Sequence, residues 1–321
     1  MTSGRDALPG PIEAAPAVPS SPSHVFIVGC ARTGSTLLRH LLNRHPRVAI
    51  ASETHFFKLA RRLGLEARLR AARPGDRAAI ERVARDLYRP EGWPWLARNV
   101  PPAELTDRLA AGEPTLRRLF TVLLELYAAR ERPGETGPIL LGEKTPEHLA
   151  MVPTLAEWFP RARFVHTFRD PRAIHASELR RRRGGHWGPK ARLPRAAGRL
   201  VDPLLGPLEL VRTSLAWRDA AERDARYRRT LGERYLLVRF EDLVAQPEAA
   251  VRDVCGFLGL DWTPSILEGV DVVGSSFAAS RHTGRGIDPT AAERWRTLDP
   301  LTRAWYSLAF RGRLTRFGYR P

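Results

Sequence analysis

The sequence predicts an α/β fold in which helices cover both faces of a central parallel sheet, giving three layers. Two observations predict it. Short β-rich runs alternate with amphipathic helical segments from His24 onward. The first run also passes through a loop of small residues directly into a helix, in "VFIVGCARTGSTLLRHLLNRHP" over residues 25–46. Ligands of such folds bind at the carboxyl ends of the strands, so we expect a site there.

The individual elements follow from the spacing of apolar residues and from turn residues between them. We expect strands over residues 24–29, 47–52, 138–144 and 162–169, and a fifth that enters a loop over 234–243. We expect helices over residues 36–45, 146–160, 173–183, 208–231 and 247–259. Residues 184–207 carry no clear periodicity and are predicted to be a loop.

The chain divides into a tail and one large domain. Residues 1–23 contain five prolines and little bulky apolar content, which predicts a disordered tail. The domain then spans residues 24–321. Residues 55–131 are predicted to form a mostly helical insertion within it, because three stretches rich in proline or glycine interrupt a helical pattern.

Composition excludes several protein classes. No apolar run approaches the roughly 18 residues that a transmembrane helix needs. The N-terminus has no basic segment leading into an apolar stretch, so we expect no secretory signal and a cytoplasmic location. Cys30 and Cys255 cannot make a disulfide framework, and neither has neighbours at metal-ligand spacing. We therefore expect a reduced protein without a metal site.

The chain is strongly basic, with a net charge of +17 that comes almost entirely from arginine. One explanation is the codon bias of a GC-rich genome, and the other is an anionic ligand. The sequence leaves both open. No segment matches a nucleic-acid-binding module, so we expect no nucleic-acid partner.

The first strand–loop–helix run almost matches the phosphate-binding P-loop of nucleotide-binding proteins. Gly29 and Gly34 have the right separation, and Gly34 allows a phosphate to approach the backbone. The lysine that would reach a nucleoside triphosphate after Gly34 is missing, and Arg32 stands two residues before that glycine. The hydroxyls that could bind phosphate oxygens are those of Thr33, Ser35 and Thr36.

A second strand–turn–helix run also carries groups suited to phosphate. In "FVHTFRDPRAIHASELR", over residues 164–180, Arg169 ends the strand and Ser177 follows eight residues later. A guanidinium offers a planar fork to phosphate oxygens, and a serine hydroxyl adds a donor. The alternative is structural, with Arg169 paired to Asp170 and Ser177 an ordinary helix residue.

These two runs, in this order, resemble the sulfotransferases that use 3′-phosphoadenosine 5′-phosphosulfate (PAPS). "ArgThrGlySerThr" at residues 32–36 is similar to their 5′-phosphosulfate loop, and Arg169 with Ser177 to the pair that holds the 3′-phosphate. The resemblance extends over about residues 24–300 and is closest to bacterial enzymes related to those that sulfonate tyrosine or heparan sugars. It implies a P-loop-like sulfotransferase fold, PAPS as donor and 3′-phosphoadenosine 5′-phosphate (PAP) as product.

A third, looser match lies in "SRHTGRGIDPTAAERWR" at residues 280–296. The family has a late basic loop that closes over the 3′-phosphate. The resemblance assigns that role to Arg281, Gly284 and Arg285, and a solvated basic loop is the alternative.

The resemblance also implies catalytic residues for an in-line displacement at sulfur. Glu53, in "SETHFF" after the second strand, is the expected general base, with capping of the next helix as the alternative and His55 as a weaker candidate. Lys144, in "GEKTPEH", is expected to stabilise the sulfonyl group and the leaving oxygen together with Arg32. Its alternative is an ion pair with Glu143 or Glu147.

The acceptor is expected to be a hydroxyl or amine on a small molecule, glycan or lipid. Residues 180–200 carry basic side chains and no acidic one, which suits a lid, an anionic substrate, contact with a membrane surface, or a solvated loop. These side chains are Arg180 to Arg183, Lys190, Arg192, Arg195 and Arg199. Trp93 and Trp95, in the helical insertion, are expected either to line the acceptor pocket or to lie in the core.

Two other functions compete with sulfonyl transfer. A P-loop kinase or NTPase predicts the missing lysine and an acid for Mg²⁺, for which Asp170 is the candidate. A non-catalytic nucleotide-binding module would need no base at residue 53.

Overall fold

The computed structural model describes residues 23–89, 92–183, 195–268, 287 and 289–321, with only the backbone described over residues 182–183 and 195–205. The predicted disordered tail lies outside these residues, except for its end at Ser23.

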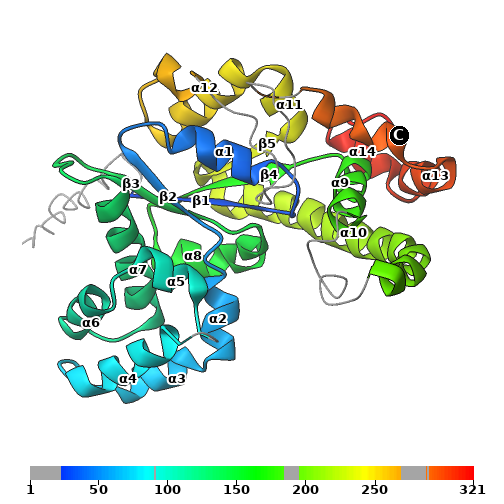
Figure 1. Cartoon of the computed structure of the whole chain (residues 1–321). Helices are drawn as coiled ribbons and strands as arrows, with labels where there is room; N and C mark the ends of the chain where they lie inside the picture. Colours follow the sequence, from blue (N-terminus) through cyan, green and yellow to red (C-terminus); the bar gives the residue numbers. More distant parts are fainter. Residues whose placement is uncertain (1–22, 90–91, 184–194, 269–286, 288) are drawn as a thin grey trace, which may run out of the picture.

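A five-stranded parallel sheet forms the centre of the molecule, in the order β2–β3–β1–β4–β5 (Figure 1). The predicted α/β class and the parallel sheet are confirmed. The strands are β1 (His24–Gly29), β2 (Val48–Ser52), β3 (Leu140–Lys144), β4 (Arg163–Phe168) and β5 (Tyr235–Arg239).

Helices cover both faces of the sheet, because successive strand residues point to opposite sides. On β1, Val25 and Ile27 pack into a core with α1 and α12. Phe26 and Val28 pack into a larger core with α7, α8 and α10 on the other face. This is the expected three-layer arrangement (Figure 1).

The remaining segments follow the predicted order. The insertion between β2 and β3 is helical and forms a cluster at one side of the sheet (Figure 1), and both of its tryptophans, Trp93 and Trp95, are buried in the larger core. The α-helices are α1 (Ser35–Leu42), α2 (Phe56–Arg62), α3 (Leu65–Ala71), α4 (Arg77–Leu87), α5 (Pro94–Asn99), α6 (Pro102–Ala110), α7 (Leu116–Glu131), α8 (Val152–Trp158), α9 (Pro171–Arg183), α10 (Arg195–Leu231), α11 (Phe240–Ala245), α12 (Pro247–Leu258), α13 (Pro300–Ala309) and α14 (Arg311–Arg316). Short 3₁₀ helices include η1 (Pro146–Met151) and η5 (Pro289–Thr297).

Two sequence predictions were wrong at the ends of elements. The loop predicted over residues 184–207 is helical from residue 195, where α10 begins. Pro203 and Pro207 favoured a loop, but each proline removes only one backbone donor and this long helix continues through them. The fifth strand ends at Arg239, and the segment expected to continue as a loop to residue 243 forms α11 instead, with Glu241 and Asp242 in its first turn, where acids stabilise a helix.

The sheet order places the site. The chain moves from β1 outward to β2 on one side, and after β4 it moves outward to β5 on the other. Strand order therefore reverses between β1 and β4, and ligands of open parallel sheets bind at such a point. The carboxyl ends of β1 and β4 carry the first loop and Arg169. Among the described residues, no helix has the length and apolar character to cross a membrane.

Candidate active site

The loop between β1 and α1 has the shape of an anion-binding turn. Arg32 and Gly34 have left-handed backbone conformations, with φ of 69° and 86°. A Cβ on Gly34 would lie 2.4 Å from a ring carbon of Phe240, so only glycine fits there. Helix α1 then begins without a side-chain cap and without an acid in its first turn. Its first amides and positive dipole end are suited to bind phosphate oxygens.

The hydroxyls of this loop have different surroundings. Thr33 is buried, donates to the Cys30 carbonyl at 2.8 Å, and contacts the Thr167 hydroxyl on β4 at 2.7 Å. Its side chain therefore fixes the loop against β4, whereas the sequence had assigned it to phosphate. Ser35 is also buried, and Thr36 is half-buried at the start of α1.

Residues of the second predicted phosphate site contact residues of the first. Arg32 donates from Nε to the Ser177 hydroxyl at 3.0 Å, and Arg169 donates from Nη1 to the Arg32 carbonyl at 3.0 Å. These two hydrogen bonds join residues that are 145 and 137 positions apart in the chain, so the two runs form one cluster. Asp170 pairs with Arg172 at 2.7 Å and leaves Arg169 without it, so the structural alternative for Arg169 is not what forms.

Arg169 is held by neutral groups. Its guanidinium carbon lies 4.0 Å from the centre of the Phe240 ring, and Nη2 donates to the Ala291 carbonyl on η5. The Trp217 indole on α10 donates to the Arg169 carbonyl at 2.9 Å. Phe240, the first residue of α11, thus supplies the ring beneath the guanidinium.

The surroundings of Arg169 fit a phosphate. The residue is 4% exposed, and its Nε has no hydrogen-bond partner among the described residues. Burial lowers its pKa to about 10, which shows how poorly the charge is solvated. Buried polar groups are normally hydrogen-bonded, and a phosphate oxygen would supply the missing partner.

Glu53 and Lys144 meet at the ends of neighbouring strands. The register pairs Ser52 with Lys144, so Glu53 follows directly beyond the last pair. Lys144 Nζ lies 2.6 Å from Glu53 Oε1 and donates to the Thr36 hydroxyl at 3.2 Å. Its partner is thus neither Glu143 nor Glu147, the two acids that the sequence offered as alternatives.

The two members of this pair differ in solvent access. The Lys144 side chain is 2% exposed and that of Glu53 is 40% exposed. Burial lowers the pKa of Lys144, although the Glu53 carboxylate opposes this shift. Glu53 does not cap α2, since that helix has His55 at its cap and no acid in its first turn. Glu53 is therefore a partly exposed carboxylate beside a buried cation.

His55, the weaker candidate base, bridges two acids. Its Nδ1 lies 3.4 Å from a Glu147 carboxylate oxygen and its Nε2 lies 3.9 Å from one of Glu53. The hydrogen bond to Glu147 is the main reason that the pKa of His55 is raised. A raised pKa favours the imidazolium, which holds the two carboxylates near each other and is a poor base.

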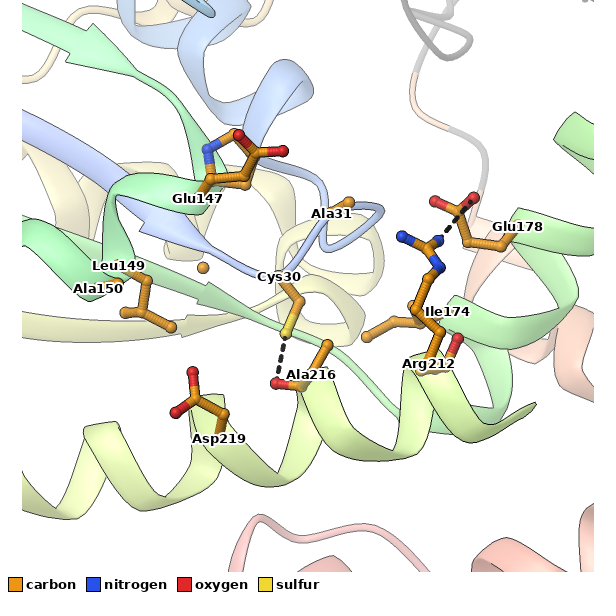
Figure 2. A pocket seen from close by; sticks show the side chains of 13 residues that line it. Cys30, Ala31, Glu147, Leu149, Ala150, Ile174, Glu178, Arg212, Ala216 and Asp219 are labelled. Atoms are coloured by element: carbon orange, nitrogen blue, oxygen red, sulfur yellow. Dashed lines mark hydrogen bonds and ion pairs between the residues drawn. The ribbon is translucent and has the colours of Figure 1, made fainter. Parts of the chain in front are cut away.

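A cavity of about 230 Å³ opens beside the first loop (Figure 2). Apolar and small residues of the loop, η1, α9 and α10 form much of its wall, and the Cys30 thiol donates to the Ala216 carbonyl. Its charged lining residues are Glu147, Glu178, Arg212 and Asp219 (Figure 2). None of its lining residues comes from residues 55–131, and of the two alternatives for Trp93 and Trp95 the structure shows the core.

Some predicted residues fall outside the described part of the chain. These are Arg281, Gly284 and Arg285 of the late basic loop, and Lys190 and Arg192 of the basic stretch. The sequence missed Phe240, Thr167 and the wall that α10 gives to the cavity, because no local pattern marks contacts between distant segments.

Comparisons with known proteins agree with this geometry. The model of the sulfotransferase family matches residues 22–264. Protein-tyrosine sulfotransferase 1 of Danio rerio is 25% identical over 306 residues, covering 92% of this chain and 72% of that protein. The omega-hydroxy-beta-dihydromenaquinone-9 sulfotransferase Stf3 of Mycobacterium tuberculosis is 25% identical over 262 residues, covering 74% of this chain and 62% of that protein.

The fold is similar to solved structures as well. The sulfotransferase domain of the Synechococcus PCC 7002 olefin synthase superposes with a TM-score of 0.57. That match covers 90% of this chain and 95% of the domain at 21% identity, which supports the fold alone. The family model, by contrast, covers most of this chain, including the loop after β1, the turn after β4 and the Glu53–Lys144 pair. The chain therefore belongs to the sulfotransferase family, whose members take a sulfonyl group from PAPS and release PAP.

Proposed function

We propose that this protein transfers the sulfonyl group of PAPS to a hydroxyl or amine, with Glu53 as general base. One observation carries the proposal: Lys144 Nζ contacts both the Glu53 carboxylate and the Thr36 hydroxyl of the phosphosulfate loop. A base and a cation thus stand together beside the helix N-terminus at which the 5′-phosphosulfate would bind.

The residues divide the work of an in-line displacement. Glu53 accepts the proton of the attacking hydroxyl as the new O–S bond forms. The bond between sulfur and the bridging oxygen breaks, and its electron pair stays on the 5′-phosphate of PAP. Lys144 and Arg32 neutralise the charge that grows on that oxygen. The acceptor becomes a sulfate ester, and the proton leaves from Glu53 to solvent.

Arg169, Ser177 and the start of α1 are the described groups that would hold the nucleotide. Arg281, Gly284 and Arg285 would complete the 3′-phosphate site by resemblance to the family. The rival kinase function is disfavoured, because Asp170, its candidate magnesium ligand, is buried in an ion pair with Arg172.

The cavity beside Cys30 and Ala31 is our candidate for the part of the acceptor that lies next to its reacting group, since Glu53 and Lys144 do not line it. Its size suits a small group, which a small molecule, a glycan or the end of a lipid could present. The zebrafish relative is named for protein tyrosine and the mycobacterial one for a menaquinone lipid, so relatives act on very different acceptors.

Calorimetry with PAP and with ATP tests the donor. We expect PAP to bind and ATP to bind at least tenfold more weakly, with Arg169→Ala losing PAP binding as the control. Uptake of ATP with Mg²⁺-dependent hydrolysis, and none of PAP, would contradict the proposal. The acceptor is then found by incubating ³⁵S-labelled PAPS with an extract of the producing cells and identifying the labelled product. We expect Glu53→Gln to abolish most labelling while PAP binding persists.

A further inference from the structure

Glu143 is a buried carboxylate directly before Lys144 on β3. The residue is 0% exposed, yet it makes four polar contacts. Its Oε1 accepts hydrogen bonds from the Thr54 amide at 3.1 Å, the Thr54 hydroxyl at 3.0 Å and the Thr145 hydroxyl. Its Oε2 lies 3.0 Å from Nδ1 of His148, which is also buried.

Each of these partners is next to a residue of the site. Thr54 follows Glu53, Thr145 follows Lys144, and His148 lies on η1 between Glu147 and Leu149, which line the cavity. Backbone pairing of β2 with β3 ends at Ser52 and Lys144, so no strand register reaches Glu53. One carboxylate therefore joins three segments at the point where backbone pairing stops.

We propose that Glu143 is a positioning residue for sulfonyl transfer, which holds Glu53 against Lys144 by binding Thr54, Thr145 and His148 at once. The inference rests on the proposed function, because that function gives the Glu53–Lys144 pair its chemistry. Reacting groups misplaced by about 1 Å can lose about 100-fold in rate, so such a connection has a catalytic consequence.

Stability alone is a weak reason to keep a carboxylate here. A buried ion pair can often be replaced by apolar residues of similar volume without loss of stability. Burial opposes ionisation of Glu143, but His148, Thr145 and Thr54 together leave its pKa below the usual value, so the group is charged. That charge also raises the pKa of Lys144, against the effect of burial. Glu143 thus acts on the site by geometry and by charge.

Two substitutions separate these effects. Glu143→Asp keeps the charge and withdraws the carboxylate by one methylene, so we expect turnover per PAP-binding site to fall by about 100-fold. The KM for PAPS and the affinity for PAP should stay within about threefold, since Arg169 and Ser177 are on other elements. Glu143→Gln keeps the oxygen and removes the charge, so we expect a loss of less than tenfold. The alkaline limb of the pH–rate profile of Glu143→Gln should move to lower pH, because without the Glu143 charge Lys144 loses its proton more easily.

Tyr235→Phe is the matched control. Tyr235 is a buried strand residue whose hydroxyl donates to Asp224 at 3.1 Å and contacts His166, far along the chain from the site. We expect this variant to lower the melting temperature while turnover per PAP-binding site stays within twofold. The assay is ³⁵S transfer from labelled PAPS into the cell extract, with active sites counted by PAP binding.

The turnover of these variants decides whether Glu143 positions Glu53. Wild-type turnover per site in Glu143→Asp would overturn the positioning role. If that variant does not fold, Thr145→Val decides: a roughly tenfold loss supports the role, and an unchanged rate overturns it. In a Glu53→Gln background, Glu143→Asp should lower turnover by less than a further threefold. A further loss of about 100-fold in turnover would show that Glu143 does not act through Glu53. Wild-type turnover in Glu53→Gln alone would refute the proposed base and not the connection itself.

Discussion

The two cationic regions of the site are held in opposite ways. At the β1–β4 corner, Arg32 and Arg169 contact a hydroxyl, carbonyls and an aromatic ring. Among the described residues, neither arginine forms an ion pair with a carboxylate. At the β2–β3 edge, Lys144 is paired with Glu53 at 2.6 Å.

We interpret this difference as a separation of nucleotide binding from catalysis. Arginines held by neutral groups keep their charge for an incoming anion, as a nucleotide-binding corner requires. At the other edge the cation is held beside a carboxylate, which is the arrangement that our proposed reaction needs, with an acceptor for a proton next to a charge that can stabilise the leaving oxygen. We therefore expect substitutions at the first corner to change PAP affinity and those at the second edge to change turnover.

The largest expected effect is on turnover. Glu53→Gln removes the proposed base, so turnover should fall by about 10²–10⁴-fold, the usual contribution of general base catalysis. PAP affinity, measured by calorimetry, should stay within threefold. Glu81→Gln, at a carboxylate on α4 that pairs with Arg77, is the control and should match the wild type. A normal rate in Glu53→Gln would remove the contrast between the two regions.

Arg169→Ala should act on affinity instead. Loss of charge-assisted hydrogen bonds worth about 1.5–3 kcal/mol corresponds to PAP binding about 10–150-fold weaker. Arg163→Ala is the control. Arg163 is the first residue of β4, at the end of the strand opposite to Arg169, and it packs on Phe257. In the double variant Arg169→Ala/Glu53→Gln, the two fold-losses in kcat/KM for PAPS should multiply. Strong non-additivity would mean that the two regions are coupled.

The pH dependence should also differ between the regions. Lys144 and Arg169 are cations whose pKa values are lowered by burial, and of the two Lys144 loses its charge first as pH rises. Turnover should fall on the alkaline side below the ordinary lysine pKa of about 10.4, as Lys144 deprotonates. PAP affinity should stay constant over the same range, because a guanidinium keeps its charge there even when burial lowers its pKa. Measuring both from pH 6 to 10 checks this, and coincident limbs would indicate one shared group.

The smallest effect is expected at Ser177. Its hydroxyl is neutral and now accepts from Arg32, so Ser177→Ala should weaken PAP binding by about 2–10-fold, the value of one ordinary hydrogen bond. Turnover at saturating PAPS should not change by more than about twofold. A loss as large as that of Arg169→Ala would show that Ser177 positions Arg32 in addition to binding phosphate.

Much of the fold follows from local pattern. The strands and the principal helices appear in the predicted order, because alternation and helical spacing of apolar residues are local properties of the chain. The errors lie where local pattern misleads, as at Pro203 and Pro207 inside α10 and at Phe240, which begins a helix where the strand was expected to enter a loop.

The candidate site was predictable as a set of residues but not as a set of contacts. Arg32, Arg169, Ser177, Glu53 and Lys144 stand out in sequence because each lies near a strand end or in a recognisable motif. No local pattern shows that Asp170 pairs with Arg172 and leaves Arg169 for a ligand. Nor does it show that Lys144 pairs with Glu53 and not with Glu143 or Glu147, which are closer to it in the sequence.

The sequence by itself determined the alternating elements, the loop that requires glycine at residue 34 and the family to which the chain belongs. Only the tertiary structure decided which charges are paired, which remain for an anion, and that Glu143 joins the ends of β2 and β3. The physical reason is that ion pairs and hydrogen bonds join residues far apart in the chain, such as Arg32 and Ser177 at 145 positions, and folding brings these together through packing that no short stretch of sequence contains.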